Sequence, residues 1–278
     1  MSPIHMSESD NLMQPEARAE LSYARAKLEA FEVKVAGAKR LGWSPVIRQR
    51  FRYYTPDECY EAALLRLIDP TSRWLDVGCG RDIFPSNRPL AQLLSKRCKT
   101  LVGVDPSPNI EQNSLVHRRA RTTLEEYVSE QQFDLVSLRM VAEHIPDPAA
   151  AVSALARLTT VGGKVVIYTV SKLSPSSLIA ASTPLAFHHI LKRLLWRTQK
   201  DDTFPTVYRM NTRSELQLLF SKSGFTEEEF FYLNDCSSFA RWRLTLILEL
   251  CFERAFRFLG LRYPEVCLLG VYKRQPEV

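Results

Sequence analysis

The sequence predicts an α/β fold with an open, mainly parallel sheet, because two kinds of spacing alternate along it. Four short apolar runs have the length of buried strands, at 73–77, 100–105, 133–138 and 164–170. Stretches with helical spacing separate them, at about 86–97, 109–114 and 147–160, and a further strand is expected near 115–119. Strands that alternate with helices in this way are joined by right-handed crossovers, so we expect them to run parallel.

Length and composition bound the class of protein. With 278 residues, 45% of them hydrophobic, the chain can bury a core and is expected to form a single domain over 16–278. The 37 basic and 31 acidic residues are too balanced to predict a nucleic-acid partner. Six cysteines without a CxxC pair argue against a disulfide framework and a structural zinc site, so a cytoplasmic location is the simplest. Residues 1–15 resemble a disordered leader, not a signal peptide.

Two helices are expected before the first strand, and together they form an N-terminal helical cap over 16–69. The first covers 16–41, where apolar residues are spaced for one helical face. The second covers 56–68, with Thr55 as the N-cap and Pro56 in the first turn. Between them, the basic stretch 48–54 is interpreted as a solvated turn in preference to a cover for a ligand.

An insertion over 171–211 follows the strand at 164–170. Within it, 185–200 predicts a basic amphipathic helix. We favour a lid over the substrate site, because a helix docked on its own domain has this pattern. The alternative is a peripheral membrane contact with Trp196 at the boundary of an anionic bilayer.

The C-terminal part, 212–278, is expected to complete the sheet. A helix over 212–222 and a strand near 227–234 precede a long helix over about 237–260 and a last strand over 265–273. The long helix carries six charges, which argue against a membrane span. It is expected to cover the sheet edge or to form a homodimer surface.

The stretch WLDVGCGRD places two glycines, Gly78 and Gly80, directly after the first strand. Such a turn lets a ligand approach the backbone. Position 83 is Ile, so the dinucleotide fingerprint is incomplete, and a P-loop lysine is missing. Asp76 would repel a pyrophosphate and attract an amino group or a sulfonium. The turn therefore predicts a positively charged ligand.

A second carboxylate, Asp105, ends the next strand, 25 residues after Gly80. At that position an acidic side chain can accept hydrogen bonds from both hydroxyls of a ribose. Asp76 and Asp105 then lie at the same carboxyl edge of the sheet.

Taken together, LDVGCG, VGVD, FDLV and GGKVVI resemble the successive motifs of class I S-adenosylmethionine-dependent methyltransferases, over about 70–170. The resemblance implies a Rossmann-like sheet of seven strands with the last antiparallel, helices on both faces, and S-adenosyl-L-methionine as the cofactor of the 70–170 core. The cofactor-binding residues that it implies are Asp76, Gly78, Cys79, Gly80, Asp105, Pro106, Thr123, Leu138 and Arg139. The acidic residue that often holds the adenine is missing; Thr122, Thr123 and Glu125 are the candidates nearby.

The segment after 133–138, RMVAEHIPDP, resembles the EH-x-x-D segment of quinone-precursor O-methyltransferases. In those enzymes a glutamate three positions earlier can help to hold a divalent metal; here Met140 stands there, and no metal is expected. His144 is the candidate catalytic base, because imidazole titrates near neutrality, or it caps the following helix. Arg139 is expected to pair with Glu143 rather than to face an anionic substrate.

The expected function is methyl transfer from S-adenosylmethionine to a small apolar or amphipathic acceptor, most readily at oxygen and by in-line displacement. The alternatives are an RNA or protein methyltransferase and a non-catalytic S-adenosylmethionine-binding protein.

Overall fold

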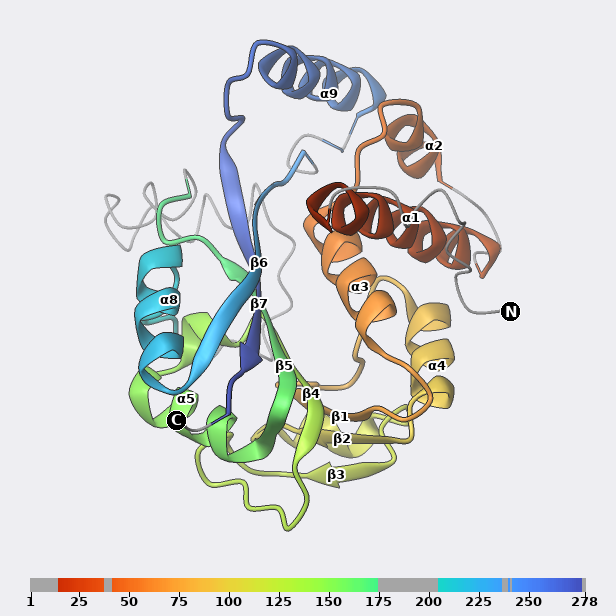
Figure 1. The fold of residues 1–278 in the computed structure, drawn as a ribbon. Coiled ribbons are helices and arrows are strands. Elements are labelled where there is room, and N and C mark those ends of the chain that lie inside the picture. The colour runs from red at the N-terminus through yellow and green to blue at the C-terminus, as the bar shows by residue number, and fades with distance from the viewer. Residues whose placement is uncertain (1–14, 38–41, 175–204, 237–239, 241, 277–278) are drawn as a thin grey trace.

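A computed structural model describes residues 15–37, 42–174, 205–236, 240 and 242–276 (Figure 1). It contains a seven-stranded sheet in the order β3-β2-β1-β4-β5-β7-β6. The strands are β1 (Arg73–Val77), β2 (Thr100–Val104), β3 (Arg118–Ala120), β4 (Phe133–Arg139), β5 (Thr159–Val170), β6 (Phe225–Asn234) and β7 (Glu265–Arg274). Strands β1 to β5 pair in parallel, and β7 runs antiparallel between β5 and β6. The predicted fold class, including the antiparallel last strand, is confirmed.

Strand order reverses between β1 and β4, because the chain continues from β1 to β2 and β3 on one side and later to β4 and β5 on the other. At such a switch point the loops after the two strands diverge to opposite faces and leave room for a ligand at the carboxyl ends. The loops after β1, β2 and β4 therefore define the candidate site.

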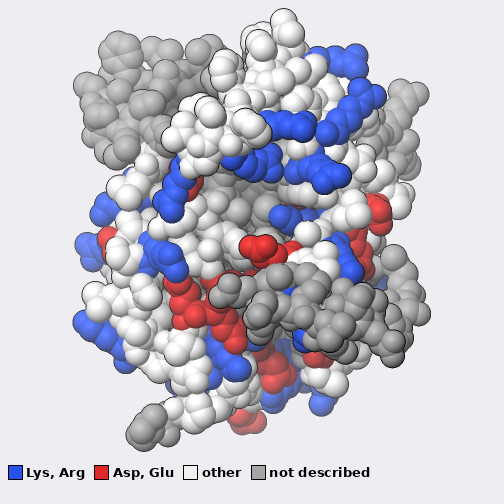
Figure 2. All heavy atoms as spheres, turned by 45° about the horizontal axis from the view of Figure 1, so that its top comes forward, with Lys and Arg blue, Asp and Glu red and all other residues white. Residues whose placement is uncertain are grey.

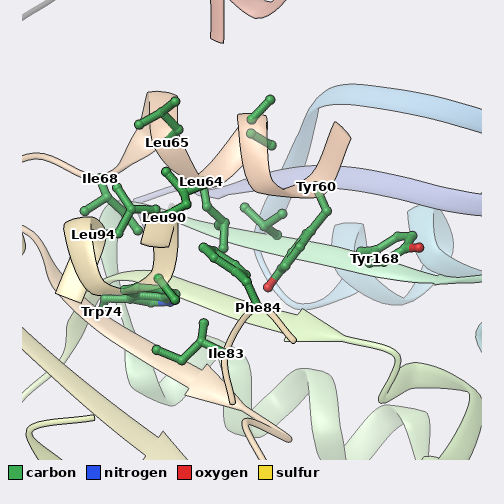
Figure 3. Packing of buried hydrophobic residues seen from close by; sticks show 14 of the residues in the cluster. Tyr60, Leu64, Leu65, Ile68, Trp74, Ile83, Phe84, Leu90, Leu94 and Tyr168 are labelled. Carbon is green, nitrogen blue, oxygen red and sulfur yellow. The ribbon is translucent and has the colours of Figure 1, made fainter. Parts of the chain in front are cut away.

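Helices cover both faces of the sheet (Figure 1). One face carries α1 (Pro15–Ala36), α3 (Pro56–Leu67) and α4 (Arg88–Arg97), and the other carries α5 (Pro148–Leu158) and α8 (Arg213–Lys222). Successive residues of β1 point to opposite faces, as strand geometry requires. Trp74 thus belongs to the core beneath α3 and α4, and Leu75 to the core beneath α5 and α8. Figure 3 shows the first of these cores, with Tyr60 and Leu64 of α3 above Trp74 and Phe84.

The start of α3 follows directly from its sequence. Thr55 and Glu58 form a reciprocal capping box, and Pro56 occupies the first turn. The fully buried Glu58 carboxylate also accepts hydrogen bonds from Arg48 at 2.5 and 3.0 Å and from Lys34 at 3.1 Å. These charges explain why the pKa of Glu58 lies below its usual value although burial opposes the shift.

The solvated basic turn expected over 48–54 holds for the exposed Arg50 and Arg52 but is wrong for Arg48 and Tyr53. Arg48 ends up buried in α2 (Trp43–Arg50), and Tyr53 is buried as well. The Tyr53 hydroxyl donates to the Asn234 carbonyl and accepts from the Cys236 amide. Tertiary partners far along the chain therefore determine this segment, and no local pattern could indicate them.

Most element boundaries lie within a few residues of the prediction, with three informative differences. The first helix ends at Ala36, and the helix expected over 109–114 is a 3-10 turn, η2 (Pro108–Gln112). Strand β5 begins at Thr159, because Gly162, with φ +80°, lets the chain continue through a bend within the strand. The amphipathic helix expected over 185–200 and most of the leader lie outside the described residues.

The long C-terminal helix, α9 (Arg243–Phe258), follows β6 and precedes β7 along the chain. It packs on α2 rather than flat on the sheet (Figure 1). A small cluster joins the two helices: Ile47, Tyr53, Cys236, Leu246 and Leu250. No helix within the described ranges combines the length and the apolar character that a bilayer span requires.

Replacing Arg48 with methionine should destabilise the fold strongly, because it leaves the buried Glu58 carboxylate without its main partner. We expect Arg48→Met to lower the free energy of unfolding by about 3–5 kcal/mol. Arg88→Met is the matched control, because the Arg88–Asp82 pair is exposed and should contribute less than about 1 kcal/mol. Chemical denaturation measures both changes, and equal effects of the two substitutions would contradict the assignment.

Candidate functional site

The glycine turn after β1 combines tight packing with open space. Gly78 and Gly80 have φ values of +70° and +47°, in the left-handed region that favours glycine. A Cβ on Gly78 would lie 2.1 Å from Cγ2 of Val141 in the loop after β4. A Cβ on Gly80 would meet only Oδ2 of Asp105, at 3.9 Å. The first glycine is therefore required for packing, and the second leaves the backbone accessible to a ligand.

Asp105 connects the end of β2 to this turn. Its Oδ2 accepts a hydrogen bond from the Gly80 amide at 2.8 Å, and its Oδ1 accepts one from the Ser107 amide at 2.7 Å. The side chain is largely buried. A carboxylate offers about four acceptor positions, so two remain for hydroxyl donors of a ligand after the turn has been fixed.

Asn113 holds the same turn from its other side, and sequence reasoning missed it. Its Nδ2 donates to the carbonyls of Gly80 at 3.2 Å and Cys79 at 3.4 Å, and the side chain is fully buried. Its own carbonyl accepts two hydrogen bonds from Arg119 of β3. In the sequence it is one polar residue within a predicted short helix, so no signal distinguished it.

Asp76 is buried inside β1, and burial raises its pKa to about 7. Its Oδ1 accepts a hydrogen bond of 2.6 Å from Ser137 of β4, whose hydroxyl accepts in turn from Trp74 Nε1 at 2.7 Å. The hydroxyl of Tyr60, also fully buried, has no hydrogen-bond partner among the described residues. Ser137 could have been noticed in the sequence as the single polar residue in the apolar end of its strand.

These groups fit a cationic ligand with a diol. Burial disfavours the ionised form of Asp76, and a positive charge nearby would offset that effect. Asp105 retains acceptor capacity, and the space beside Gly80 is open. The residues therefore suit the amino acid and ribose parts of S-adenosylmethionine, which the sequence resemblance implied.

Arg139, at the end of β4, pairs with a different acid from the one expected. It donates to Asp57 of α3 at 2.9 Å, so the predicted pair with Glu143 is wrong. The partner comes from the N-terminal cap, 82 positions earlier, which helical spacing could not indicate. The next residue, Met140, has a φ of +53°, and its amide donates to the Tyr168 carbonyl at 2.8 Å. A strained residue at the carboxyl end of a central strand is common at functional sites.

Glu143 fastens the loop after β4 to the returning end of the insertion. Its buried carboxylate accepts from the Thr169 hydroxyl at 2.7 Å, and its carbonyl accepts from the Val207 amide at 2.7 Å. Asn211 completes the connection by donating to Thr169 Oγ1 and to the Val170 carbonyl. These contacts tie the insertion to the sheet edge where the glycine turn lies.

His144 does not cap the following helix, because Asp147 does so through the amides of Ala149 and Ala150. Its Nδ1 lies 3.1 Å from the Pro205 carbonyl oxygen. A carbonyl can only accept, so this contact calls for the proton of a neutral ring to sit on Nδ1, while Nε2 lies 4.0 Å from Glu143 Oε1. This is the tautomer that a general base needs at Nε2.

The remaining predicted residues differ in what they can offer. Cys79 is buried against Gly103, where a Cβ would lie 2.6 Å from its sulfur. Leu138 is fully buried in the core beneath α5 and α8, so only its backbone can reach a ligand. Thr123 accepts from the Glu126 amide at 3.4 Å, and Pro106 is exposed. None of the four has a side-chain geometry that singles it out.

Within the described ranges, no cluster of three or more His, Cys, Asp or Glu side chains is placed to hold a metal ion. The Glu143 carboxylate is engaged by Thr169.

Comparison with known proteins bears on the family and the fold of this chain. A family model described as a methyltransferase domain matches residues 46–229. The ubiquinone biosynthesis O-methyltransferase of Alkalilimnicola ehrlichii is 35% identical over 118 residues, which cover 39% of this chain and 45% of that protein. The Hahella chejuensis enzyme of the same name is 31% identical over 136 residues, 45% of this chain and 53% of its own length. The chain thus spans about half the length of these curated relatives.

One solved structure supports the fold. A crystal structure from Listeria monocytogenes, described as that of an S-adenosylmethionine-dependent methyltransferase, superposes with a TM-score of 0.51 at 13% identity. The superposition covers 80% of this chain and 99% of the other.

The raised pKa of Asp76 predicts how stability depends on pH. The folded protein binds this proton up to about pH 7, and the unfolded chain releases it near pH 4. The contribution of Asp76 to the free energy of unfolding should therefore fall as pH rises from about 4 to 7. Asp76→Asn should make this dependence shallower, as followed by the thermal midpoint across that range.

Glu61 provides an independent comparison, because burial raises its pKa to about 7 too. Glu61→Gln should also make the free energy of unfolding less dependent on pH over the same range. The effects of the Glu61 and Asp76 substitutions should add. An Asp76→Asn variant with the pH dependence of the wild type would show that Asp76 is ionised in the folded protein near pH 5.

Proposed function

We propose, from the premise that this chain belongs to the methyltransferase domain family, that it transfers a methyl group from S-adenosylmethionine to a hydroxyl oxygen of a small apolar or amphipathic acceptor. One observation carries the proposal: two buried carboxylates, Asp76 and Asp105, flank a glycine turn with open space beside Gly80. Carboxylates in these positions disfavour a phosphate, and a cation beside Asp76 would favour its ionised form.

The residues at the turn would hold the cofactor in two places. Asp105 would accept hydrogen bonds from the ribose hydroxyls with the acceptor positions that Gly80 and Ser107 leave. Asp76 would face the ammonium of the methionine part, whose charge favours the ionised carboxylate. The buried Tyr60 hydroxyl, whose pKa is raised by burial and by the charge of Asp76, would join Asp76 at this end.

When bound, S-adenosylmethionine supplies a methyl group on a positively charged sulfur, to be attacked in line by the acceptor oxygen. The contribution of this chain is to align the two partners and to manage one proton. Alignment alone can supply much of the rate in such a displacement. His144 would take the hydroxyl proton on Nε2, while Pro205 holds Nδ1 and fixes the ring.

The acceptor class rests on three supports. The relatives are named for O-methylation in ubiquinone biosynthesis. The Glu143–His144 segment resembles that of quinone-precursor methyltransferases, and it lies beside the site. The stacked rings of Tyr60 and Tyr168, 5.3 Å apart, give the end of β5 an apolar aromatic character. A phenolic or quinol ring carrying an apolar tail fits all three.

Asp105→Asn should lower the affinity for S-adenosylmethionine by about tenfold or more, because hydrogen bonds to a charged acceptor contribute about 1.5–3 kcal/mol. Isothermal titration calorimetry measures the change. Asp82→Asn is the control, since the Asp82 carboxylate in the same loop pairs with Arg88 at 2.5 Å. If Asp105→Asn binds the cofactor as the wild type does, Asp105 does not hold the ribose.

His144→Gln should slow methyl transfer in a way that depends on the acceptor. We expect a loss of about 10²-fold for a hydroxyl that is protonated at the assay pH and little loss for a phenol that is already ionised. The assay follows labelled methyl transfer to a series of phenols and quinols across pH. Equal rates for wild type and variant on every acceptor would exclude the base role.

A further inference from the structure

Helix α9 presents apolar residues to the outside of the protein. Leu244, Leu248 and Phe252 are spaced four apart, so they form one stripe along the helix, and their exposed fractions are 68%, 49% and 61%. Phe258 and Leu259 continue the stripe at the end of the helix, with 90% and 66% exposed. We call these five residues the outer stripe of α9.

The charged residues of α9 are arranged in the opposite sense to those of an ordinary surface helix. Glu249 and Glu253 face inward and are buried, and Glu253 accepts from Asn234 and Arg257. Arg243 and Arg254 are exposed beside the outer stripe. A surface helix normally buries its apolar face and exposes its acids. Here the exposed side of α9 is apolar with a basic flank.

The position of α9 relates this surface to the candidate site. The helix joins the end of β6 to the start of β7. Both β5 and β6 pair antiparallel with β7, so they run in the same direction. Helix α9 therefore lies beyond the carboxyl edge of the sheet, the edge that carries the glycine turn (Figure 1).

Exposed basic side chains gather at this end of the molecule. In Figure 2, Lys and Arg side chains gather over the part that carries α2 and α9, and the larger groups of Asp and Glu lie below them. Arg50 and Arg52, which follow the buried part of α2, are exposed as well. A negatively charged, apolar surface complements both features at once.

We propose that α9 lies on an anionic lipid bilayer, with its outer stripe in the boundary between head groups and acyl chains. An amphipathic helix with a basic flank binds such a surface through buried apolar area and attraction to anionic lipids. A second copy of this chain fits the outer stripe less well. A twofold contact through α9 would bring its arginines close to those of the other copy, and the buried glutamates of the helix could not offset this repulsion. The inference does not depend on the proposed acceptor or on catalysis.

The test is flotation of the full chain with vesicles of equal parts phosphatidylglycerol and phosphatidylcholine, and with phosphatidylcholine alone. The wild type should float with the anionic vesicles, and added salt should weaken binding. Leu248→Ser with Phe252→Ser should reduce partitioning by at least about tenfold. Arg243→Glu with Arg254→Glu should remove the preference for anionic lipid.

The matched control is Val128→Ser with Val161→Ser, two exposed apolar residues at the opposite end of the sheet, which should float as the wild type does. Because the outer stripe is exposed, its serine variant should keep the thermal midpoint of the wild type. The proposal is overturned if the wild type stays with the unbound fraction. It is overturned equally if the stripe variant floats unchanged, which would assign binding to another segment such as 185–200, or if sedimentation shows that the stripe substitutions convert a dimer into monomers.

Discussion

The hydrogen bond from the Gly80 amide to the Asp105 carboxylate is the interaction on which the site depends. It joins the turn after β1 to the end of β2 over 2.8 Å, and it holds Gly80 in a left-handed conformation beside open space. The same bond places a carboxylate beside the open space at Gly80, which favours a ligand of positive sign. The ligand class follows from that sign, since the backbone of a glycine turn alone would accept a phosphate equally well.

A second set of contacts joins the loop after β4, which carries Glu143 and His144, to the insertion. Glu143 binds Thr169 through its carboxylate and Val207 through its carbonyl, and His144 contacts Pro205. The loop after β4 is therefore fixed both to β5 and to the segment that returns from the insertion. Under the proposed function, this arrangement lets the same few residues orient the candidate base and anchor one end of the segment that follows β5.

Much of the fold and half of the site could be predicted from the sequence, for identifiable reasons. Buried strands and glycine turns are local patterns, so β1, β2, β4 and the positions of Asp76 and Asp105 were accessible. The partner of Arg139 was not, because Asp57 lies on α3 and meets the end of β4 only in the packed fold. The partner of Arg48 was not, because Glu58 belongs to the next helix, and sequence spacing does not show how two helices pack. The inward glutamates and outward leucines of α9 were likewise invisible, since helical spacing defines faces without saying which face is covered.

The central claim is that the crevice selects a cation carrying a ribose over an anionic nucleotide. Calorimetric titration of the full chain with S-adenosylmethionine, its demethylated product, NAD and ATP, each under the same buffer, tests it directly. The account predicts saturable binding of S-adenosylmethionine and of its product at one site per chain, with no heat from NAD or ATP. Tight binding of either nucleotide without uptake of the methyl donor would contradict it.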